Sequence, residues 1–394
     1  MAAPFPTLHI DLISGIEKDR QIPLYAKRDI ALVRGEGSYL YDSEGNRYLD
    51  AMSNYGVAAL GHADPEYTAS MLDQLHHLTT CHQSFYNDAR AAALAAIDLI
   101  APDGLTRTFF SNSGAEAIEA ALKFARVSTG RNHFVAARRG YHGRTLGALA
   151  VTADPKYRGP FEPFGAEVTH VAYNDVEGIE AAMTNETAAV ILEPIQGEAG
   201  IYPADDAFLQ AARDASTARG ALLIADEIQT GFRTGAPFAI SQSGVRPDIL
   251  CSAKAIANGF PIGVTLVTEA VSERIPAGTH GTTFGANPLA CRAVVATLNA
   301  FEQRGLYDNS TTIGNRLIGA LEALDHPKVR AVRGRGLMIG VELKERVTPT
   351  LRALQERGVL ALPASPVVFR LLPPLIWGEE QADEFIAALT DALG

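Results

Sequence analysis

The sequence predicts an α/β protein: a large domain built on a mostly parallel sheet, with a smaller α+β domain beside it. Between about residues 65 and 292, alanine-rich helical stretches alternate with apolar runs of four to six residues. These runs are rich in β-branched or aromatic residues and lack polar–apolar alternation, which is typical of strands buried on both faces of a sheet. At 394 residues the chain also exceeds the size at which one hydrophobic core stops growing, so we expect two domains.

The expected elements follow in order along the chain. GSYLYDSEGNRYLD indicates two short strands joined by the Ser43–Asn46 turn, an antiparallel hairpin. Helices are expected over residues 89–100, 114–127 and 205–219. The apolar runs among them are RTFFS, HFVAA, THVAY, AAVILEP, ALLIADE, PDILCSA and GVTLVT.

The smaller domain is expected to combine both ends of the chain. VRGRGLMIGVELK and VVFRLLPPL, which follow helical patterns beyond residue 292, are expected to be its strands, and the N-terminal hairpin joins them. The predicted division is residues 1–56 and 292–394 for the small domain and residues 57–291 for the large, cofactor-binding domain.

Composition excludes several classes of protein. A formal charge of −11 argues against a nucleic-acid-binding protein, whose phosphate contacts need a basic face. Three scattered cysteines without a CxxC pair indicate reduced thiols in a cytoplasmic protein. The start, MAAPFPTLHIDL, has no basic segment followed by an apolar run, and no uncharged apolar stretch reaches about 18 residues. We therefore expect neither a signal peptide nor membrane association, and no metal site.

The first candidate site is the junction between the strand RTFF and the helix that follows it. Ser113, Gly114 and Ala115 would lie at the helix N-terminus, where free backbone N–H groups and the helix dipole favour a phosphate. The same residues are also typical of an ordinary N-cap followed by an acidic first turn. By itself this motif leaves both interpretations open.

Two further strand ends carry a carboxylate and a lysine. ALLIADE ends in Asp226 and Glu227, at the sheet edge where α/β proteins bind ligands. DILCSAK delivers Lys254 at the end of another apolar strand. Alternatively, the acids form a solvated strand end and the lysine lies at the surface, because a lysine becomes reactive only when burial or nearby cations lower its pKa.

One cofactor would use all three elements. Pyridoxal phosphate requires a phosphate cradle, a lysine that forms a Schiff base, and an anion that keeps its pyridine nitrogen protonated. The chain offers these parts in that order, each at the carboxyl end of a predicted strand. The combination predicts a pyridoxal-phosphate site, which none of the parts predicts alone.

From the hairpin to RLLPPL, nearly the whole chain resembles the class III (fold type I) aminotransferases, which depend on pyridoxal phosphate. The matching motifs are NSGAEA, GYHGRTLGAL, ILEPIQGEAG, DEIQTG, SAKAIANGFPIG, HGTTFGANPLA and VRGRGLMIGVEL. The resemblance is to the acetylornithine aminotransferase branch, including relatives that act on carrier-protein-bound aminoadipate semialdehyde. It implies transfer of the terminal amino group of an ornithine- or lysine-like compound to 2-oxoglutarate, or the reverse, in arginine or lysine biosynthesis.

The resemblance also implies roles for individual residues. Lys254 would hold the cofactor as a Schiff base and move a proton between substrate and cofactor. Asp226 would pair with the pyridinium nitrogen, and Gln229 would donate a hydrogen bond near the phenolic oxygen. The other implied cofactor contacts are Ser113, Gly114 and Ala115 at the phosphate, Tyr141 and Ile228 on the two ring faces, and Thr282 with Thr283 at the phosphate of a partner subunit. The implied assembly is therefore a homodimer with shared active sites.

Two arginines are implied to bind substrate carboxylates, since a guanidinium group matches a carboxylate bidentately. Arg370 would take the α-carboxylate of glutamate, and Arg144 a second carboxylate. Glu198 resembles the family's gate, which pairs with Arg370 when an ω-amine is bound and releases it for glutamate. Glu193 and Tyr25 match positions that line the same pocket.

The chain departs from the family's pattern in three places. The loop GFRTG is one residue shorter than usual near the pocket mouth, which leaves the choice of substrate open. Tyr141 replaces the usual phenylalanine and should still stack on the cofactor. Ala286 replaces a glycine, which reduces the freedom of the backbone there.

Two alternatives remain at this point. An ω-amine transaminase of the 4-aminobutyrate or ornithine type, or an aminomutase, would use the same cofactor. A nicotinamide-dependent dehydrogenase would use Gly334 and Gly336, although VRGRGLMIGVEL continues as a strand where a dinucleotide motif requires a helix.

Positive charge is concentrated in one stretch of this acidic chain. Between Ala121 and Pro160, a single acid, Asp154, accompanies Lys123, Arg126, Arg131, Arg138, Arg139, Arg144, Lys156 and Arg158. One interpretation is a solvated surface, with the first two residues favoured by a helix C-terminus. The other is that Arg138 and Arg139, on one side of Arg144, attract an acidic substrate or an acidic carrier protein to the pocket.

Overall fold

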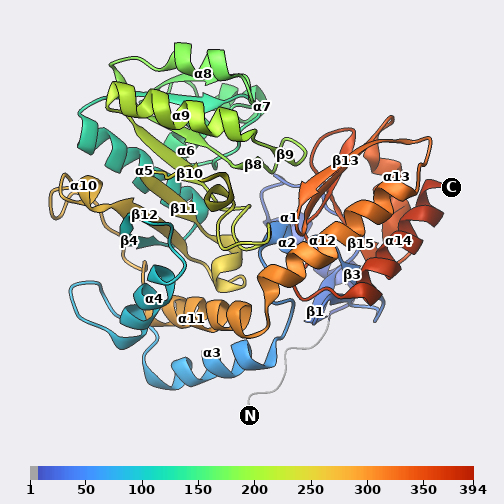
Figure 1. Cartoon of the computed structure of the whole chain (residues 1–394). Coiled ribbons are helices and arrows are strands. Elements are labelled where there is room, and N and C mark those ends of the chain that lie inside the picture. Colours follow the sequence, from blue (N-terminus) through green and yellow to red (C-terminus); the bar gives the residue numbers. More distant parts are fainter. Residues whose placement is uncertain (1–7) are drawn as a thin grey trace.

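A seven-stranded sheet forms the centre of the computed structural model, which describes residues 8–394 (Figure 1). In spatial order its strands are β4 (Leu105–Ser111), β12 (Gly263–Thr268), β11 (Ile249–Ser252), β10 (Leu222–Asp226), β7 (Thr187–Leu192), β5 (His133–Ala137) and β6 (Glu167–Val171). Only β12 is antiparallel to its neighbours; the other pairs are parallel. All seven predicted strands are confirmed, and so is the mostly parallel α/β sheet.

Both faces of this sheet are buried, as the lack of alternation predicts. Along β7, Val190 and Leu192 belong to one hydrophobic cluster, whereas Ala189 and Ile191 belong to a second cluster on the opposite face. Successive side chains of a strand point to opposite faces, so a strand covered on both sides needs an apolar residue at every position.

Helices cover the two faces of the large sheet (Figure 1). On one face lie α5 (Gly114–Thr129) and α6 (Leu146–Val151), whose residues share a cluster with alternate strand residues. The other cluster includes α8 (Val176–Ala182), α9 (Asp206–Arg219), α4 (Asp88–Asp98) and α11 (Pro288–Gln303). The helices expected over residues 89–100, 114–127 and 205–219 are confirmed as α4, α5 and α9, with ends shifted by one or two residues.

Two smaller sheets lie apart from the large one. The first has the order β1 (Leu32–Glu36), β2 (Tyr39–Asp42), β3 (Arg47–Asp50) and β15 (Val359–Leu360); the second has β13 (Val329–Arg335), β14 (Met338–Leu343), β17 (Val368–Leu371) and β16 (Leu362–Pro363). The predicted hairpin is β2–β3, and Leu49 of β3 pairs with Val359 of β15 in parallel. The two ends of the chain therefore meet in one sheet.

Helices α12 (Leu306–Ala323), α13 (Val347–Glu356) and α14 (Glu379–Leu393) pack beside these smaller sheets. The predicted boundary at residues 291 and 292 falls inside α11, which packs against α3 (Pro65–His77) and α4. Residues 1–7 of the predicted N-terminal segment, 1–56, lie outside the described residues. The division into residues 1–56, 57–291 and 292–394 stays a prediction.

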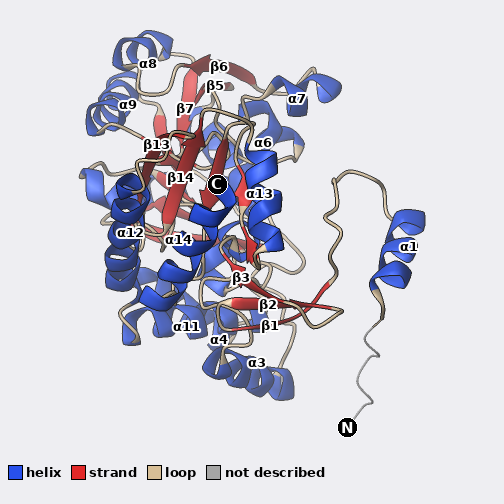
Figure 2. Cartoon of the chain, turned by 90° about the vertical axis from the view of Figure 1, so that its right-hand side faces the viewer, coloured by secondary structure: helices blue, strands red, loops and turns tan. Residues whose placement is uncertain are grey.

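The remaining elements are short or peripheral. Helix α1 (Ile10–Arg20) stands away from the body of the molecule and has no buried residue (Figure 2). The others are α2 (Ser53–Gly56), α7 (Pro155–Arg158), α10 (Glu269–Ser272), β8 (Ile195–Gln196), β9 (Tyr202–Pro203), and the 3₁₀ turns η1 (Gly159–Phe161), η2 (Ala239–Ser243) and η3 (Lys254–Ala257). No helix within residues 8–394 combines the length and apolar character needed to cross a membrane. Cys81, Cys251 and Cys291 are free thiols.

Candidate active site

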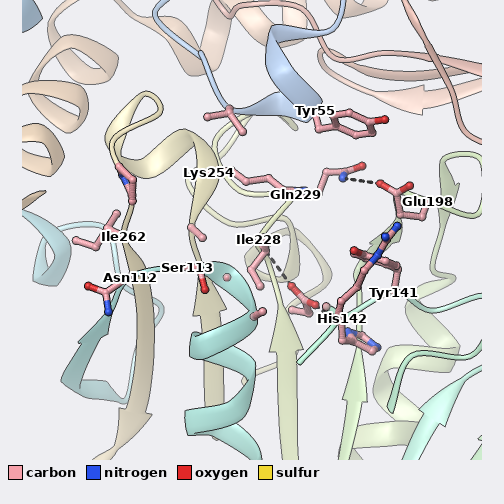
Figure 3. Close-up of a pocket in the computed structure, with 18 of the residues that line it drawn as sticks. Tyr55, Asn112, Ser113, Tyr141, His142, Glu198, Ile228, Gln229, Lys254 and Ile262 are labelled. Carbon is pink, nitrogen blue, oxygen red and sulfur yellow. Dashed lines mark hydrogen bonds and ion pairs between the residues drawn. The ribbon is translucent and has the colours of Figure 1, made fainter. Parts of the chain in front are cut away.

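A cavity of about 680 Å³ opens where the parallel strands end (Figure 3). Its walls come from the loops that follow β4, β5, β7, β10 and β11. Because the carboxyl ends of parallel strands meet at one edge of a sheet, side chains far apart in sequence converge there. Most of the predicted site residues line this cavity: Tyr25, Ser113, Gly114, Ala115, Tyr141, Arg144, Glu193, Glu198, Asp226, Ile228, Gln229 and Lys254.

The first turn of α5 opens into the cavity. Ser113 is the N-cap, and its hydroxyl accepts a hydrogen bond from the backbone N–H of Glu116 at 3.2 Å. A Cβ at Gly114 would lie 3.0 Å from Ile228 methyl carbons, so a glycine allows Ile228 to pack over the helix start. The two interpretations of this motif are thus compatible: Ser113 is an ordinary N-cap, and the helix end also faces a cavity that suits an anion.

Lys254 follows β11 and extends into the cavity (Figure 3). Its φ of +50° lies in the left-handed region, which costs energy for a residue with a side chain and is concentrated at functional sites. Burial lowers the pKa of Lys254 from 10.5 to about 8. The amine therefore does not behave as a surface lysine, and it can exchange a proton near neutral pH.

Asp226 ends β10 beneath the cavity and is buried against a histidine that the sequence interpretation missed. Its Oδ2 lies 2.7 Å from His142 Nδ1, and its Oδ1 accepts from the backbone N–H of Ile228 at 3.0 Å. Burial alone would lower the pKa of His142, but the hydrogen bond and the negative charge of Asp226 outweigh it and raise that pKa. His142 follows Tyr141 in the motif GYHGRT, which was the available signal.

Glu193 organises the loop that carries Tyr141. Its two carboxylate oxygens accept from the backbone N–H groups of Tyr141 at 2.9 Å and Gly197 at 3.0 Å. Burial raises the pKa of Glu193 to about 7, with Asp226 adding to the rise and His142 opposing it. Glu193 therefore belongs to one buried group of titratable side chains with Asp226 and His142.

Behind the cavity wall, Arg370 binds two residues that line the cavity, Glu198 and Gln229. Its Nη2 lies 2.7 Å from Glu198 Oε1, and its Nη1 donates to Gln229 Oε1 at 3.0 Å. Gln229 also donates to Glu198, at 3.5 Å. Arg370 is fully buried and is therefore not a solvated surface charge. The predicted pairing of Arg370 with Glu198 is present in the structure.

Tyr55 was also missed by the sequence interpretation. It lies on an unusual turn in which Ser53, Asn54, Tyr55 and Gly56 all have positive φ. The guanidinium carbon of Arg370 lies 5.1 Å from the centre of the Tyr55 ring, within the range of a cation–π contact. Consecutive left-handed residues are costly, and the sequence carries no clear signal for them apart from Gly56.

The exposed part of the cavity lining, which we call its mouth, contains the other predicted carboxylate-binding arginine. Arg144 is exposed, and its guanidinium carbon lies 4.4 Å from the centre of the Tyr157 ring. Tyr157 in turn contacts Tyr141 edge to face, with ring centres 6.0 Å apart. Tyr25, 68% exposed, completes this side. The predicted residues Arg144 and Tyr25 are therefore both exposed, in contrast to the buried Arg370.

Thr282 and Thr283 do not line the cavity of their own chain. Thr282 accepts a hydrogen bond from Asn112, beside the start of α5, at 2.9 Å, and Thr283 is exposed. Their predicted contact with the phosphate in a partner subunit stays a prediction.

Comparison with known proteins identifies the family. The model of the family described as aminotransferase class-III matches residues 24–393. The chain belongs to the class III aminotransferases. It is 46% identical to a LysW-aminoadipate semialdehyde transaminase from Deinococcus radiodurans, over 96% of this chain and 89% of the relative. An acetylornithine aminotransferase from Methanopyrus kandleri is 42% identical, over 94% of this chain and 95% of the relative.

A solved structure of ornithine aminotransferase from Toxoplasma gondii, 29% identical, superposes with a TM-score of 0.93 over 98% of this chain and 94% of that chain. That structure is described as having pyridoxal phosphate at partial occupancy in its active site. The family and the solved fold confirm the predicted fold class and the aminotransferase activity. Gly334 and Gly336 lie at the β13–β14 hairpin with no helix after them, so the dehydrogenase alternative is wrong.

The residues of this class III aminotransferase fit the cofactor that the family implies. A helix N-terminus for a phosphate, a buried carboxylate for a ring nitrogen, and a lysine with a lowered pKa all face one cavity. Gly114 leaves the helix start open, since a side chain there would collide with Ile228. These are the groups that pyridoxal phosphate requires.

Proposed function

We propose that this enzyme transfers the terminal amino group of an ornithine- or lysine-like compound to 2-oxoglutarate, or the reverse, in arginine or lysine biosynthesis. The observation that carries the proposal is the buried Arg370, paired with Glu198 of a cavity that Lys254 and Asp226 also line. An arginine that is held by one carboxylate can exchange it for a substrate carboxylate, which a guanidinium group can bind bidentately. The names of the relatives from Deinococcus and Methanopyrus support this substrate class.

The cofactor, when bound, supplies a carbonyl group and a ring that withdraws electrons. Ser113, Gly114 and Ala115 would hold its phosphate through backbone N–H groups. Asp226, held by His142, would keep a proton on its ring nitrogen.

Lys254 would move a proton at the substrate carbon that carries the amino group. Its pKa of about 8 allows it to act both as acid and as base near neutral pH. Tyr141 and Ile228 would cover the two faces of the ring and exclude water. These roles are assigned on the resemblance and are supported by the position of each residue at the cavity.

Glu198 would let one site accept two kinds of substrate. With the carboxylate of Glu198 2.7 Å from Arg370, the positive charge is neutralised and the region beside Arg370 suits an uncharged chain that bears a terminal amine. When Glu198 turns away, Arg370 is free for the α-carboxylate of glutamate. Arg144 at the mouth would take the carboxylate at the other end of either substrate.

Half-reactions test the substrate directly. The cofactor-loaded enzyme is mixed with N-acetylornithine, ornithine, 4-aminobutyrate, or lysine linked to an acidic carrier protein, and cofactor absorbance is followed. We expect fast reaction with N-acetylornithine or the carrier-linked lysine, followed by return with 2-oxoglutarate. Preference for 4-aminobutyrate would support the alternative ω-amine transaminase, and isomerisation without 2-oxoglutarate would support an aminomutase.

We also propose a homodimer with shared active sites. Thr283 is exposed, and Thr282 bonds to Asn112 next to the phosphate cradle, an arrangement in which this segment can contact a neighbouring subunit. Thr283→Ala should reduce cofactor affinity through the neighbouring subunit. Mixing it with the inactive Lys254→Ala should restore partial activity, because both lesions can fall in one composite site. Absence of complementation, with subunit exchange demonstrated by mass spectrometry, would contradict shared sites.

An acidic carrier protein is a further proposed partner. Arg138, Arg139, Arg144 and Lys156, the basic rim, form no ion pair with any acid in the described part of the chain, although the enzyme is strongly acidic. Of these four residues Arg144 lines the cavity. Unpaired cations attract an acidic ligand over long distances, so the others can act without touching the cavity. We propose a cytoplasmic location on the basis of the free cysteines.

A further inference from the structure

Behind the cavity lies a second fully buried arginine, and it has no acidic partner. Arg233 belongs to the shortened loop GFRTG, and its side chain is 0% exposed. Its Nη1 donates to the carbonyl oxygens of Leu337 at 3.0 Å and Pro373 at 3.5 Å. Within residues 8–394 its Nε and Nη2 have no hydrogen-bond partner and no acid pairs with it, and burial lowers the pKa of Arg233 to about 10. An uncompensated buried charge is costly, so this arginine calls for an explanation.

The two carbonyl groups belong to neighbouring strands. Leu337 immediately precedes β14 and Pro373 follows β17 by two residues; these strands are antiparallel, with Ile339 opposite Leu371. In the same register Leu337 and Pro373 stand opposite each other at the strand ends. Arg233 therefore joins the end of this strand pair to a loop of the large sheet. The backbone adds to the link, since the carbonyl oxygen of Arg233 accepts from the N–H of Leu337 at 2.9 Å.

The strand pair carries the predicted carboxylate-binding residue. Arg370 lies in β17, three residues before Pro373, and it hydrogen-bonds to Gln229, four residues before Arg233. The segment from Gln229 to Arg233 thus contacts the segment from Arg370 to Pro373 twice. One contact lies at the cavity wall, and the other lies behind it.

The turn that carries Tyr55 meets the same point. A Cβ at Gly56 would lie 3.2 Å from Nε and Nη2 of Arg233, so the guanidinium packs directly on this backbone. The turn is also tied to the strand, because the Ser53 hydroxyl donates to the Leu372 carbonyl at 2.6 Å. Three segments at the cavity wall therefore converge on one side chain.

We propose that Arg233 is a positioning residue for carboxylate recognition: it holds Arg370, Gln229 and Tyr55 in their mutual geometry without entering the cavity. The inference rests on the proposed role of Arg370 in binding the α-carboxylate of glutamate. One nitrogen, Nη1, donates to both carbonyl groups, while the rest of the planar guanidinium packs on Gly56. Lysine could supply the donors but lacks the planar group that packs on the turn, and methionine supplies no donor.

The test compares Arg233→Lys and Arg233→Met with a matched control, Arg335→Met, which removes an arginine near the end of the adjacent β13 that bonds only to Gln242. We expect the KM for glutamate to rise about tenfold or more in Arg233→Met, and less in Arg233→Lys, because a small displacement of a binding group is costly. The KM for N-acetylornithine should stay within about twofold, since its carboxylate is assigned to Arg144. Arg335→Met should leave both constants unchanged.

A binding measurement provides a readout separate from turnover. The dissociation constant of glutarate, a dicarboxylate that cannot react, is measured by calorimetry for each folded variant and should rise in proportion to the KM for glutamate. If both Arg233 variants fail to fold, Ser310→Ala is a milder probe, because the Ser310 hydroxyl donates to the Arg233 carbonyl at 2.6 Å. Ser310→Ala should raise the dissociation constant of glutarate about threefold, as expected for loss of one hydrogen bond.

Equal changes in both KM values, or an unchanged glutarate constant in folded variants including Ser310→Ala, would overturn the inference and leave Arg233 a general structural residue. Arg370→Lys separates this failure from that of the proposed function. If Arg370→Lys raises the KM for glutamate while the Arg233 variants do not, the positioning role alone is wrong. If Arg370→Lys leaves the KM for glutamate unchanged, the proposed binding of a substrate carboxylate by Arg370 is wrong. The inference about Arg233, which rests on that proposal, is then overturned too.

Discussion

The two arginines proposed to bind substrate carboxylates are held in opposite ways. Arg370 is fully buried and is fixed by Glu198, Gln229 and the ring of Tyr55. Arg144 is exposed and rests on the face of Tyr157. A guanidinium buried against neighbouring side chains is confined to one geometry, whereas an exposed one keeps its rotamer freedom and is screened by salt. Changes at Arg370 should therefore strongly weaken the recognition of glutamate, and changes at Arg144 should shift substrate preference.

The largest effect is expected at Lys254, which lines the cavity and is proposed to act in both half-reactions. Lys254→Ala should fold and bind pyridoxal phosphate non-covalently, and it should lose about 10²- to 10⁴-fold in kcat because it lacks the acid–base group. The visible absorbance of the covalently bound cofactor, recorded before and after borohydride, checks this. Lys156→Ala, on the basic rim, is the control. An intact covalent absorbance in Lys254→Ala would show that another lysine is used.

Asp226→Asn should come next, because it breaks a buried pair with His142. Removing one partner of such a pair costs on the order of 3–5 kcal/mol, and loss of the negative charge would leave the ring nitrogen without its counter-ion. We expect weaker cofactor binding and nearly abolished turnover, measured by cofactor titration and single-turnover kinetics. Asp98→Asn, at the exposed end of α4, should change neither. Near-normal activity of Asp226→Asn would rule out its role at the ring nitrogen.

His142→Gln should have a smaller and pH-dependent effect. The pKa of His142 is raised above its ordinary value of 6.5 in the folded protein by Asp226, in spite of burial. Its proton therefore adds stability that is fully present below about pH 6.5 and is lost as the pH rises through the folded pKa. The loss of unfolding free energy in the variant, on the order of 1–3 kcal/mol, should shrink as the pH rises above about 6.5. Denaturant titrations of the apoenzyme at several pH values measure this loss. A loss that does not vary with pH would contradict the pH-dependent contribution of the His142 proton.

The smallest effect is expected for Arg138 and Arg139 of the basic rim. Replacing Arg138 and Arg139 together by Glu should raise the KM for an acidic or carrier-linked amine about three- to tenfold at low salt, because long-range attraction is lost. The glutamate half-reaction should be nearly unchanged, and the loss should shrink at high ionic strength. KM is measured for each half-reaction at two salt concentrations. An equal effect on both substrates, or none, would make the rim an ordinary solvated surface and favour a small free amine such as N-acetylornithine.

Much of the active site could be predicted from the sequence, but two of its residues could not. Lys254 and Asp226 could be predicted because each directly follows an apolar strand, and the end of a parallel strand leads to the ligand-binding edge. His142 and Tyr55 were missed because neither ends a strand. The first is positioned by the fold of a loop after β5, and the second by a left-handed turn that only tertiary contacts hold in place.

The sequence by itself determined the elements and their order. Strands buried on both faces and helices with one apolar face leave patterns within short stretches of chain, and those patterns do not depend on distant residues. Only the tertiary structure decided which charges are buried and what they meet. Arg233, Arg370 and Arg144 are equivalent as letters in a sequence, yet the fold places the first against two carbonyl groups, the second against a carboxylate and the third in solvent. The reason is that the energy of a charge depends on its surroundings, and those surroundings come from segments far apart in the chain.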